Sequence, residues 1–192
     1  MILSDTAVLE DRVNRDDTAG TGLATGRWWV HAAGSRLLLD ARVCGMVGVR
    51  GRFTEVAGRV DITPDPVDSR LHIQVLAASL TTGNAGRDAL LTAAGLIDPD
   101  AGPVLHFRSR TLSRGSGQAS WRVDGLLSTA RGDRPLTLAL STACVAGAEI
   151  RIDATGRIGR DDIAYLLARP GTARLLGPVA ELDLTVTLRR SR

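Results

Sequence analysis

The chain contains no lysine, and only 3% of its 192 residues are aromatic. All 24 basic residues are therefore arginines, and they are spread among 21 acidic residues to give a net charge of +3. Proteins that bind nucleic acid usually gather their basic residues on one face or helix, so this even distribution argues against a nucleic-acid partner. The scarcity of aromatic residues means that the core must be built mainly from aliphatic side chains.

Cysteine is also scarce, since Cys44 and Cys144 are the only two, and neither belongs to a C-x-x-C pair. Their spacing excludes the usual zinc and thioredoxin-type motifs. Two isolated thiols fit a reducing compartment, and whether they pair stays open. No apolar run reaches the roughly 20 residues that a membrane-spanning helix needs, and the N-terminus does not resemble a signal peptide. We therefore expect a cytoplasmic protein without a transmembrane segment.

Length and composition indicate one folded domain. With 192 residues, 44% of them apolar, the chain is long enough to form a sizeable core. Residues 1–25 are polar, with several charged residues and glycines, and we expect them to form a flexible leader. Residues 26–192 then form a single domain without an internal repeat.

Most of this domain shows the alternation of apolar and polar residues that is typical of half-buried strands. The alternating segments are 56–62, 71–77, 105–108, 119–127, 136–140, 150–153 and 182–189. Two short helices are expected, one at 86–94 with Thr82 or Asn84 as its N-cap and one at 159–167. Many strands joined by short turns favour an all-β sandwich or a closed barrel.

Residues that could carry out chemistry are few and isolated. His31, His72 and His106 have no histidine, cysteine or carboxylate nearby in the sequence at metal-ligand spacing. The Gly-x-Ser-x-Gly context of a serine nucleophile is absent. The sequence therefore predicts no catalytic residue, no metal site and no cofactor.

One ordered set of segments resembles a known family. The segments are Ser79–Asp88 (Ser-Leu-Thr-Thr-Gly-Asn-Ala-Gly-Arg-Asp), Pro103–Ser109 with its Phe-x-Ser strand, Ala41–Phe53, Arg134–Leu138, Ile158–Ile163 and Leu176–Gly177. Single pieces of this set are common in proteins, but their order is specific. Over roughly residues 27–189 the chain resembles the YceI-like, polyisoprenoid-binding proteins.

The resemblance implies an extended, eight-stranded antiparallel β-barrel of the lipocalin-like type, with one or two short helices. It also implies a long isoprenoid chain inside the barrel, such as an isoprenoid lipid or quinone, bound without catalysis. A barrel of eight strands is wide enough for one slim ligand. The alternation predicts which side chains face that ligand: Leu39, Ala41, Val60, Ile73, Val75, Phe107, Trp121, Val123, Leu138, Leu140, Ile152, Leu184 and Val186.

Three charged residues are candidates for contact with a ligand head group. Arg87 and Asp88 follow the Thr-Gly-Asn turn, and Arg50 flanks a hairpin glycine. A structural role is the stronger interpretation for Arg87 and Asp88, as a pair that pins the helix over the barrel end. For Arg50, a solvated hairpin is the stronger interpretation.

The chain also departs from the family pattern, which motivates a second hypothesis. Histidines that the family carries near the barrel ends are replaced by Gly34, Val43, Leu90 and Arg131. Ligand binding could have been lost while the fold was kept. The alternative is thus a protein-interaction module whose barrel is filled by its own side chains. A homodimer is compatible with either hypothesis, whereas an enzyme has little support.

Overall fold

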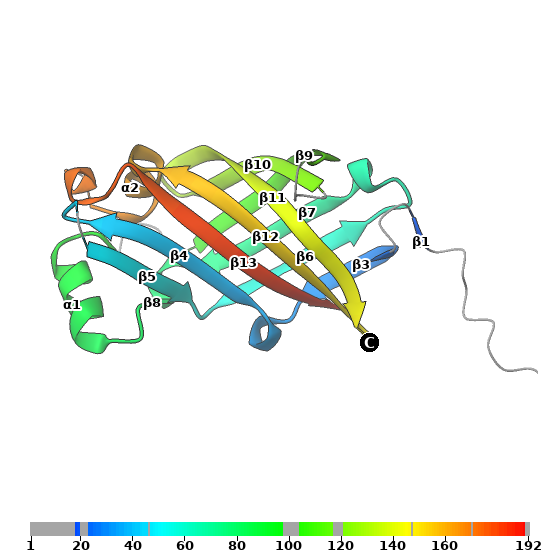
Figure 1. Cartoon of the computed structure of the whole chain (residues 1–192), viewed down its shortest axis with the longest axis horizontal. Coiled ribbons are helices and arrows are strands. Elements are labelled where there is room, and N and C mark those ends of the chain that lie inside the picture. Colours follow the sequence, from blue (N-terminus) through cyan, green and yellow to red (C-terminus); the bar gives the residue numbers. More distant parts are fainter. Residues whose placement is uncertain are drawn as a thin grey trace, which may run out of the picture.

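The computed structural model describes residues 18–19, 23–45, 47–97, 104–116, 121–146, 148–169 and 171–190, and the described part is an elongated barrel of antiparallel strands (Figure 1). The strands are β1 (Thr18–Ala19), β2 (Leu23–Ala24), β3 (Gly26–Val30), β4 (Arg36–Val43), β5 (Val47–Phe53), β6 (Val56–Ile62), β7 (Arg70–Leu76), β8 (Leu80–Thr81), β9 (Val104–Arg114), β10 (Trp121–Thr129), β11 (Gly132–Ala146), β12 (Glu149–Gly159) and β13 (Val179–Arg189). The helices are α1 (Ala85–Ala93) and α2 (Arg160–Leu167), and four 3₁₀ turns are η2 (Ala32–Gly34), η3 (Pro66–Asp68), η4 (Ala77–Ser79) and η5 (Ala173–Leu175).

The barrel closes because β13 pairs on both of its edges. On one side β13 runs along β12, and on the other it pairs with β4 near its start and with β3 near its end. The order from β12 through β11, β10, β9, β7 and β6 to β3 completes the ring. Since β3 and β4 form one interrupted strand, as do β5 with β6 and β7 with β8, the barrel has eight strands, as the sequence predicted.

Two of the interruptions are stabilised by buried or half-buried serines. Ser79 Oγ accepts hydrogen bonds from the backbone N–H groups of Thr54 (3.2 Å) and Glu55 (3.1 Å), at the bend between β5 and β6. Ser35 Oγ accepts from the N–H of Thr187 (3.0 Å) beside η2. Bends free backbone groups from the ladder, and buried polar groups need partners, so these serines let the strands bend at little cost.

The core forms two apolar clusters along the barrel. One cluster surrounds Trp28 and includes Val123, Ile150 and Leu188, each with 0% exposure. The other lies toward the helices, where α2 contributes Ile163 and further apolar side chains. Both predicted helices are confirmed within a residue or so at each end, and Asn84 is the N-cap of α1.

The segment expected to be a flexible leader lies mostly outside the described residues. Within its described part, β1 pairs with β2, and Leu23 is buried in the first core cluster. Trp28 Nε1 donates a hydrogen bond to the carbonyl oxygen of Ala24 at 3.0 Å. Among the described residues, Leu23 therefore packs against the barrel just before the predicted domain boundary at residue 26, and the flexible leader stays a prediction. In the described part of the chain, no helix is long and apolar enough to cross a membrane.

Candidate functional site

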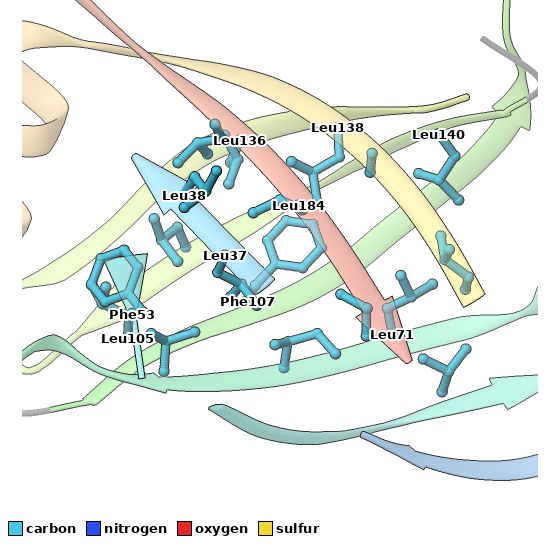
Figure 2. A pocket seen from close by; sticks show the side chains of 18 residues that line it. Leu37, Leu38, Phe53, Leu71, Leu105, Phe107, Leu136, Leu138, Leu140 and Leu184 are labelled. Carbon is cyan, nitrogen blue, oxygen red and sulfur yellow. The ribbon is translucent and has the colours of Figure 1, made fainter. Parts of the chain in front are cut away.

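A cavity of about 120 Å³ lies inside the barrel, and every side chain that lines it is apolar (Figure 2). All eight strands of the ring contribute to this central cavity. Its 18 lining residues are Leu37, Leu38, Phe53, Val60, Leu71, Ile73, Val75, Leu105, Phe107, Leu127, Leu136, Leu138, Leu140, Ile152, Ala154, Leu182, Leu184 and Val186. Such a lining can bury hydrocarbon but offers no side-chain hydrogen bond to a head group.

Strand alternation and register bring these side chains together. Phe107 on β9 is opposite Ile73 on β7 and opposite Leu127 on β10, so three neighbouring strands direct apolar groups to one level of the barrel. Leu184 on β13 is opposite Leu37 in the same way. Side chains directly opposite each other lie on one face of a sheet. Here that face is turned to the lumen, because all of these residues line the central cavity.

A glycine makes room for the aromatic ring of Phe107. A Cβ atom at Gly125 would stand 2.7 Å from the Phe107 ring and 2.5 Å from the carbonyl oxygen of Arg108. The register between β9 and β10 also shifts next to Gly125. Glycine in a strand often marks such a bulge or a close approach. Gly125 thus permits Phe107 to occupy the barrel interior.

A second, smaller cavity of about 50 Å³ lies toward the helices. It is bordered by β4 and β5, by Leu91 of α1 and by Ile163 of α2. Thr82 is its one side chain with a polar atom among the described lining residues, and Leu96 lies where the chain leaves α1. This end cavity shares no lining residue with the central one, so the interior is divided between two spaces.

The residues predicted to face a ligand fall into three groups. The central cavity is lined by Val60, Ile73, Val75, Phe107, Leu138, Leu140, Ile152, Leu184 and Val186. Leu39 and Ala41 line the end cavity. Trp121 and Val123 line neither cavity: both are buried in the core cluster around Trp28. The binding role of all these residues stays a prediction.

Five of the other lining residues follow from the same pattern that found these. Leu71, Leu105, Leu136, Ala154 and Leu182 each lie two residues from a predicted residue in the same strand. Extending the alternation by one step would have included them. Leu38 could not be found this way, because its neighbours Leu37 and Leu39 have the buried parity.

Arg87 and Asp88 both bind the turn that precedes α1. Asp88 accepts hydrogen bonds from the Thr81 hydroxyl (2.7 Å), the Thr82 N–H (2.9 Å) and the Thr82 hydroxyl. The bond from the Thr82 hydroxyl, followed by those from the Thr81 hydroxyl and the Thr82 N–H, lowers the pKa of Asp88 below its usual value. Arg87 Nε donates to the Thr82 hydroxyl and Nη2 to the Thr82 carbonyl oxygen, each at 2.9 Å. The two residues thus fasten α1 to the end of β8, which accounts for them structurally.

Arg50 lies on the outer face of the barrel. Its Nε is 2.8 Å from Oδ1 of Asp40, its cross-strand partner on β4, and its side chain is 70% exposed. The hydrogen bond with Asp40 raises the pKa of Arg50. A residue in this position is directed away from both cavities and forms a solvated surface pair.

Two of the histidines lie near each other on the outer face. The ring centroids of His72 on β7 and His106 on β9 are 6.1 Å apart. Loss of solvent, followed by the charges of Arg108 and Arg59, lowers the pKa of His72. Positive neighbours disfavour a bound cation, and no group of three or more histidine, cysteine or acidic residues is placed to hold a metal among the described residues. Cys44 and Cys144 are free, exposed thiols.

Comparisons with known proteins agree with this geometry. The model of the YceI-like domain matches residues 28–188. BcnA from Burkholderia cenocepacia has a similar structure, with a TM-score of 0.68 and 17% identity over 82% of this chain and 98% of that one. A polyisoprenoid-binding domain from Saccharophagus degradans, implicated in plant cell wall breakdown, gives a TM-score of 0.58 and 15% identity over 85% and 98% of the two chains. The YceI protein of Campylobacter jejuni gives 0.59 and 19% over 77% and 88%. The search of curated proteins found no match.

Proposed function

Because the chain belongs to the YceI-like family, we propose that it binds a long apolar ligand inside the barrel and carries or stores it without catalysis. An isoprenoid lipid or an isoprenoid quinone is the ligand class that fits best. The similar domain from Saccharophagus degradans is a polyisoprenoid-binding domain, and an extended prenyl chain is slim enough for a barrel of eight strands.

The observation that carries this proposal is the uniformly apolar lining of the central cavity. Burial of hydrocarbon contributes roughly 25 cal/mol for each Å² removed from water, less the cost of association. Affinity would therefore come from the length of the chain and not from polar contacts with a head group. The lining carries no acid, base or nucleophile, so it supports binding and offers no group for a reaction.

One observation favours the alternative, a barrel filled by its own side chains. The two cavities measure about 120 and 50 Å³, whereas ligand sites usually measure about 300–1,000 Å³. A long chain could enter only if side chains between the two spaces changed rotamer. An interaction module with a closed lumen would need no such movement.

Mass spectrometry separates the two functions. The purified protein is examined intact under native conditions, and its organic extract is analysed for long-chain lipids. A prenyl lipid or quinone in stoichiometric amount is the expected result. A protein without ligand that also fails to bind added quinones and polyprenols would overturn the carrier and support the filled barrel.

A matched pair of variants tests the placement of the ligand. Ala154→Leu adds a larger side chain to the central cavity, and Ala139→Leu makes the same change on the outer face, opposite Thr155. We expect Ala154→Leu to reduce bound ligand at least fivefold and Ala139→Leu to leave it unchanged, with both variants folded by circular dichroism. Equal ligand in the two variants would place the ligand elsewhere.

A further inference from the structure

The two cavities in the barrel meet at one row of cross-strand neighbours. This row consists of Leu37 on β4, Phe53 on β5 and Leu80 on β8, since Phe53 is opposite Leu37 on one side and Leu80 on the other. Leu37 and Phe53 line the central cavity, whereas Leu80 lines the end cavity. The boundary between the two spaces therefore passes along this row.

The next pair of cross-strand neighbours belongs to the end cavity. Its members are Leu39 on β4 and Gly51 on β5, which are opposite each other. A Cβ at Gly51 would lie 2.6 Å from Cδ1 of Leu80, so Leu80 already occupies the space above this glycine. Along β5, the step from Phe53 to Gly51 therefore leads from a large aromatic ring to no side chain at all.

Phe53 is one of only two phenylalanines in the chain, and both line the central cavity. Their surroundings differ. Phe107 is opposite Ile73 and Leu127, which line the same cavity, while Phe53 borders the end cavity through Leu80. In Figure 2 the ring of Phe53 is at the edge of the labelled group and that of Phe107 is near its centre. Phe53 is thus the aromatic residue at the boundary.

The backbone beside Phe53 is held in place. Phe53 ends β5, and the next two N–H groups, of Thr54 (3.2 Å) and Glu55 (3.1 Å), both donate to Ser79 Oγ. An aromatic ring on a fixed backbone can still rotate about its side-chain bonds. The ring of Phe53, and not the strand that carries it, is therefore the part that can open the boundary.

We propose that the ring of Phe53 is the partition between the two cavities and sets the length of the apolar ligand that the barrel accepts. A cavity of about 150 Å³ holds one benzene molecule, so the central cavity of about 120 Å³ has room for only the first part of a prenyl chain. A longer chain reaches the end cavity when the ring turns aside. The length limit rests on the proposed function, whereas the partition itself requires no natural ligand.

Xenon tests the partition without any lipid, because it enters dry apolar cavities. Methyl signals of ¹³C-labelled protein are followed by NMR under xenon pressure in Phe53→Ala and in the matched variant Phe107→Ala, which removes the same ring from inside the central cavity. The methyl signals of Leu39 and Leu91, which line the end cavity, should shift at least threefold more in Phe53→Ala. Equal shifts in the two variants, or none in either, would overturn the partition.

Tail length tests the limit on the ligand. A quinone with a tail of two isoprene units and one with a tail of eight are titrated against the unaltered protein and both variants, with tryptophan fluorescence as the readout. Phe53→Ala should raise the affinity for the long tail relative to the short one roughly tenfold, because joined cavities bury more hydrocarbon. Phe107→Ala enlarges the central cavity for both tails and should keep this ratio within twofold. An unchanged ratio in Phe53→Ala, or an equal rise in Phe107→Ala, would overturn the role of Phe53.

Both alanine variants lose a large buried ring, so circular dichroism first establishes that each is folded. Phe53→Leu and Phe107→Leu replace them if either unfolds, and the same difference between the two positions is expected. Xenon shifts that follow Phe53 in a protein that binds neither quinone would overturn the carrier and the length limit and keep the partition. Binding of both quinones with no effect particular to Phe53 would overturn the partition alone.

Discussion

At the scale of single residues, the shape of the lumen depends as much on small residues as on large ones. Gly125 leaves the space that the Phe107 ring fills, and Ala154 keeps β12 from closing the central cavity. Charged residues act differently, since Asp88 works through three hydrogen bonds to one turn.

Gly125→Ala should strongly destabilise the barrel. Its new Cβ would meet the Arg108 carbonyl oxygen at 2.5 Å, and overpacking of this kind costs about 3 kcal/mol. For a chain of this size the melting temperature should fall by about 10 °C, measured by circular dichroism. Gly48→Ala is the control, because nothing lies within 4 Å of a Cβ at Gly48. Equal melting temperatures for the two variants would refute the close approach.

Asp88 should make stability depend on pH in the acid range. Its pKa is lower in the folded chain than in the unfolded chain, so its contribution is complete above the unfolded value and is lost as pH falls through the folded one. Urea midpoints at pH 6 and pH 3 should therefore differ more for the unaltered protein than for Asp88→Asn. Identical pH dependence in both proteins would show that Asp88 does not contribute in this way.

At the scale of elements, α1 is the helix held least firmly. No residue of α1 is buried, whereas α2 buries Ile163, Leu166 and Leu167. Segments with few buried apolar contacts open with the lowest free energies. The stability of α1 therefore rests on its ends, and above all on its N-cap.

Asn84→Ala should loosen α1 without unfolding the barrel. Asn84 Oδ1 accepts from the N–H of Arg87 at 2.9 Å, and loss of such a cap costs about 1 kcal/mol. Hydrogen exchange of the α1 amides should become about fivefold faster, because local opening governs that rate. Asp65→Ala removes the side-chain cap of η3 and should leave α1 exchange unchanged. Faster exchange across the whole barrel would contradict a local effect.

At the scale of the whole molecule, closure makes the barrel one cooperative unit. β13 joins β12 to both β3 and β4, and Leu188 near its end has 0% exposure. A closed ring has no free edge at which a strand can separate alone. A destabilising substitution in β13 should therefore lower the stability of the entire sheet.

Leu188→Ala should lower the free energy of unfolding by about 3 kcal/mol. Circular dichroism follows the sheet, and tryptophan fluorescence follows Trp28 and Trp121 in the core cluster that contains Leu188. The two transitions should shift together, as expected for two-state unfolding. Separate transitions would show that the two ends of the barrel unfold independently.

Local sequence patterns were enough to identify most of the strands, their inward faces and the two helices. Alternation with a period of two depends only on local geometry, so the sequence alone assigns Ile73, Phe107 and Leu184 to the lumen side. The caps of the helices are equally local, as Asn84 shows. The ordered motifs indicated the family because they mark the same turns and bends.

The position of each inward side chain along the barrel follows from the folded structure and not from local pattern. Trp121 and Val123 have the inward parity but are buried in the core cluster around Trp28, whereas Leu37 and Phe53 line the central cavity. The structure also placed Leu90 on an exposed face and divided the lumen between two cavities. The physical reason is that strand tilt, register and packing around a closed ring join residues far apart in sequence, and local alternation does not encode those distances.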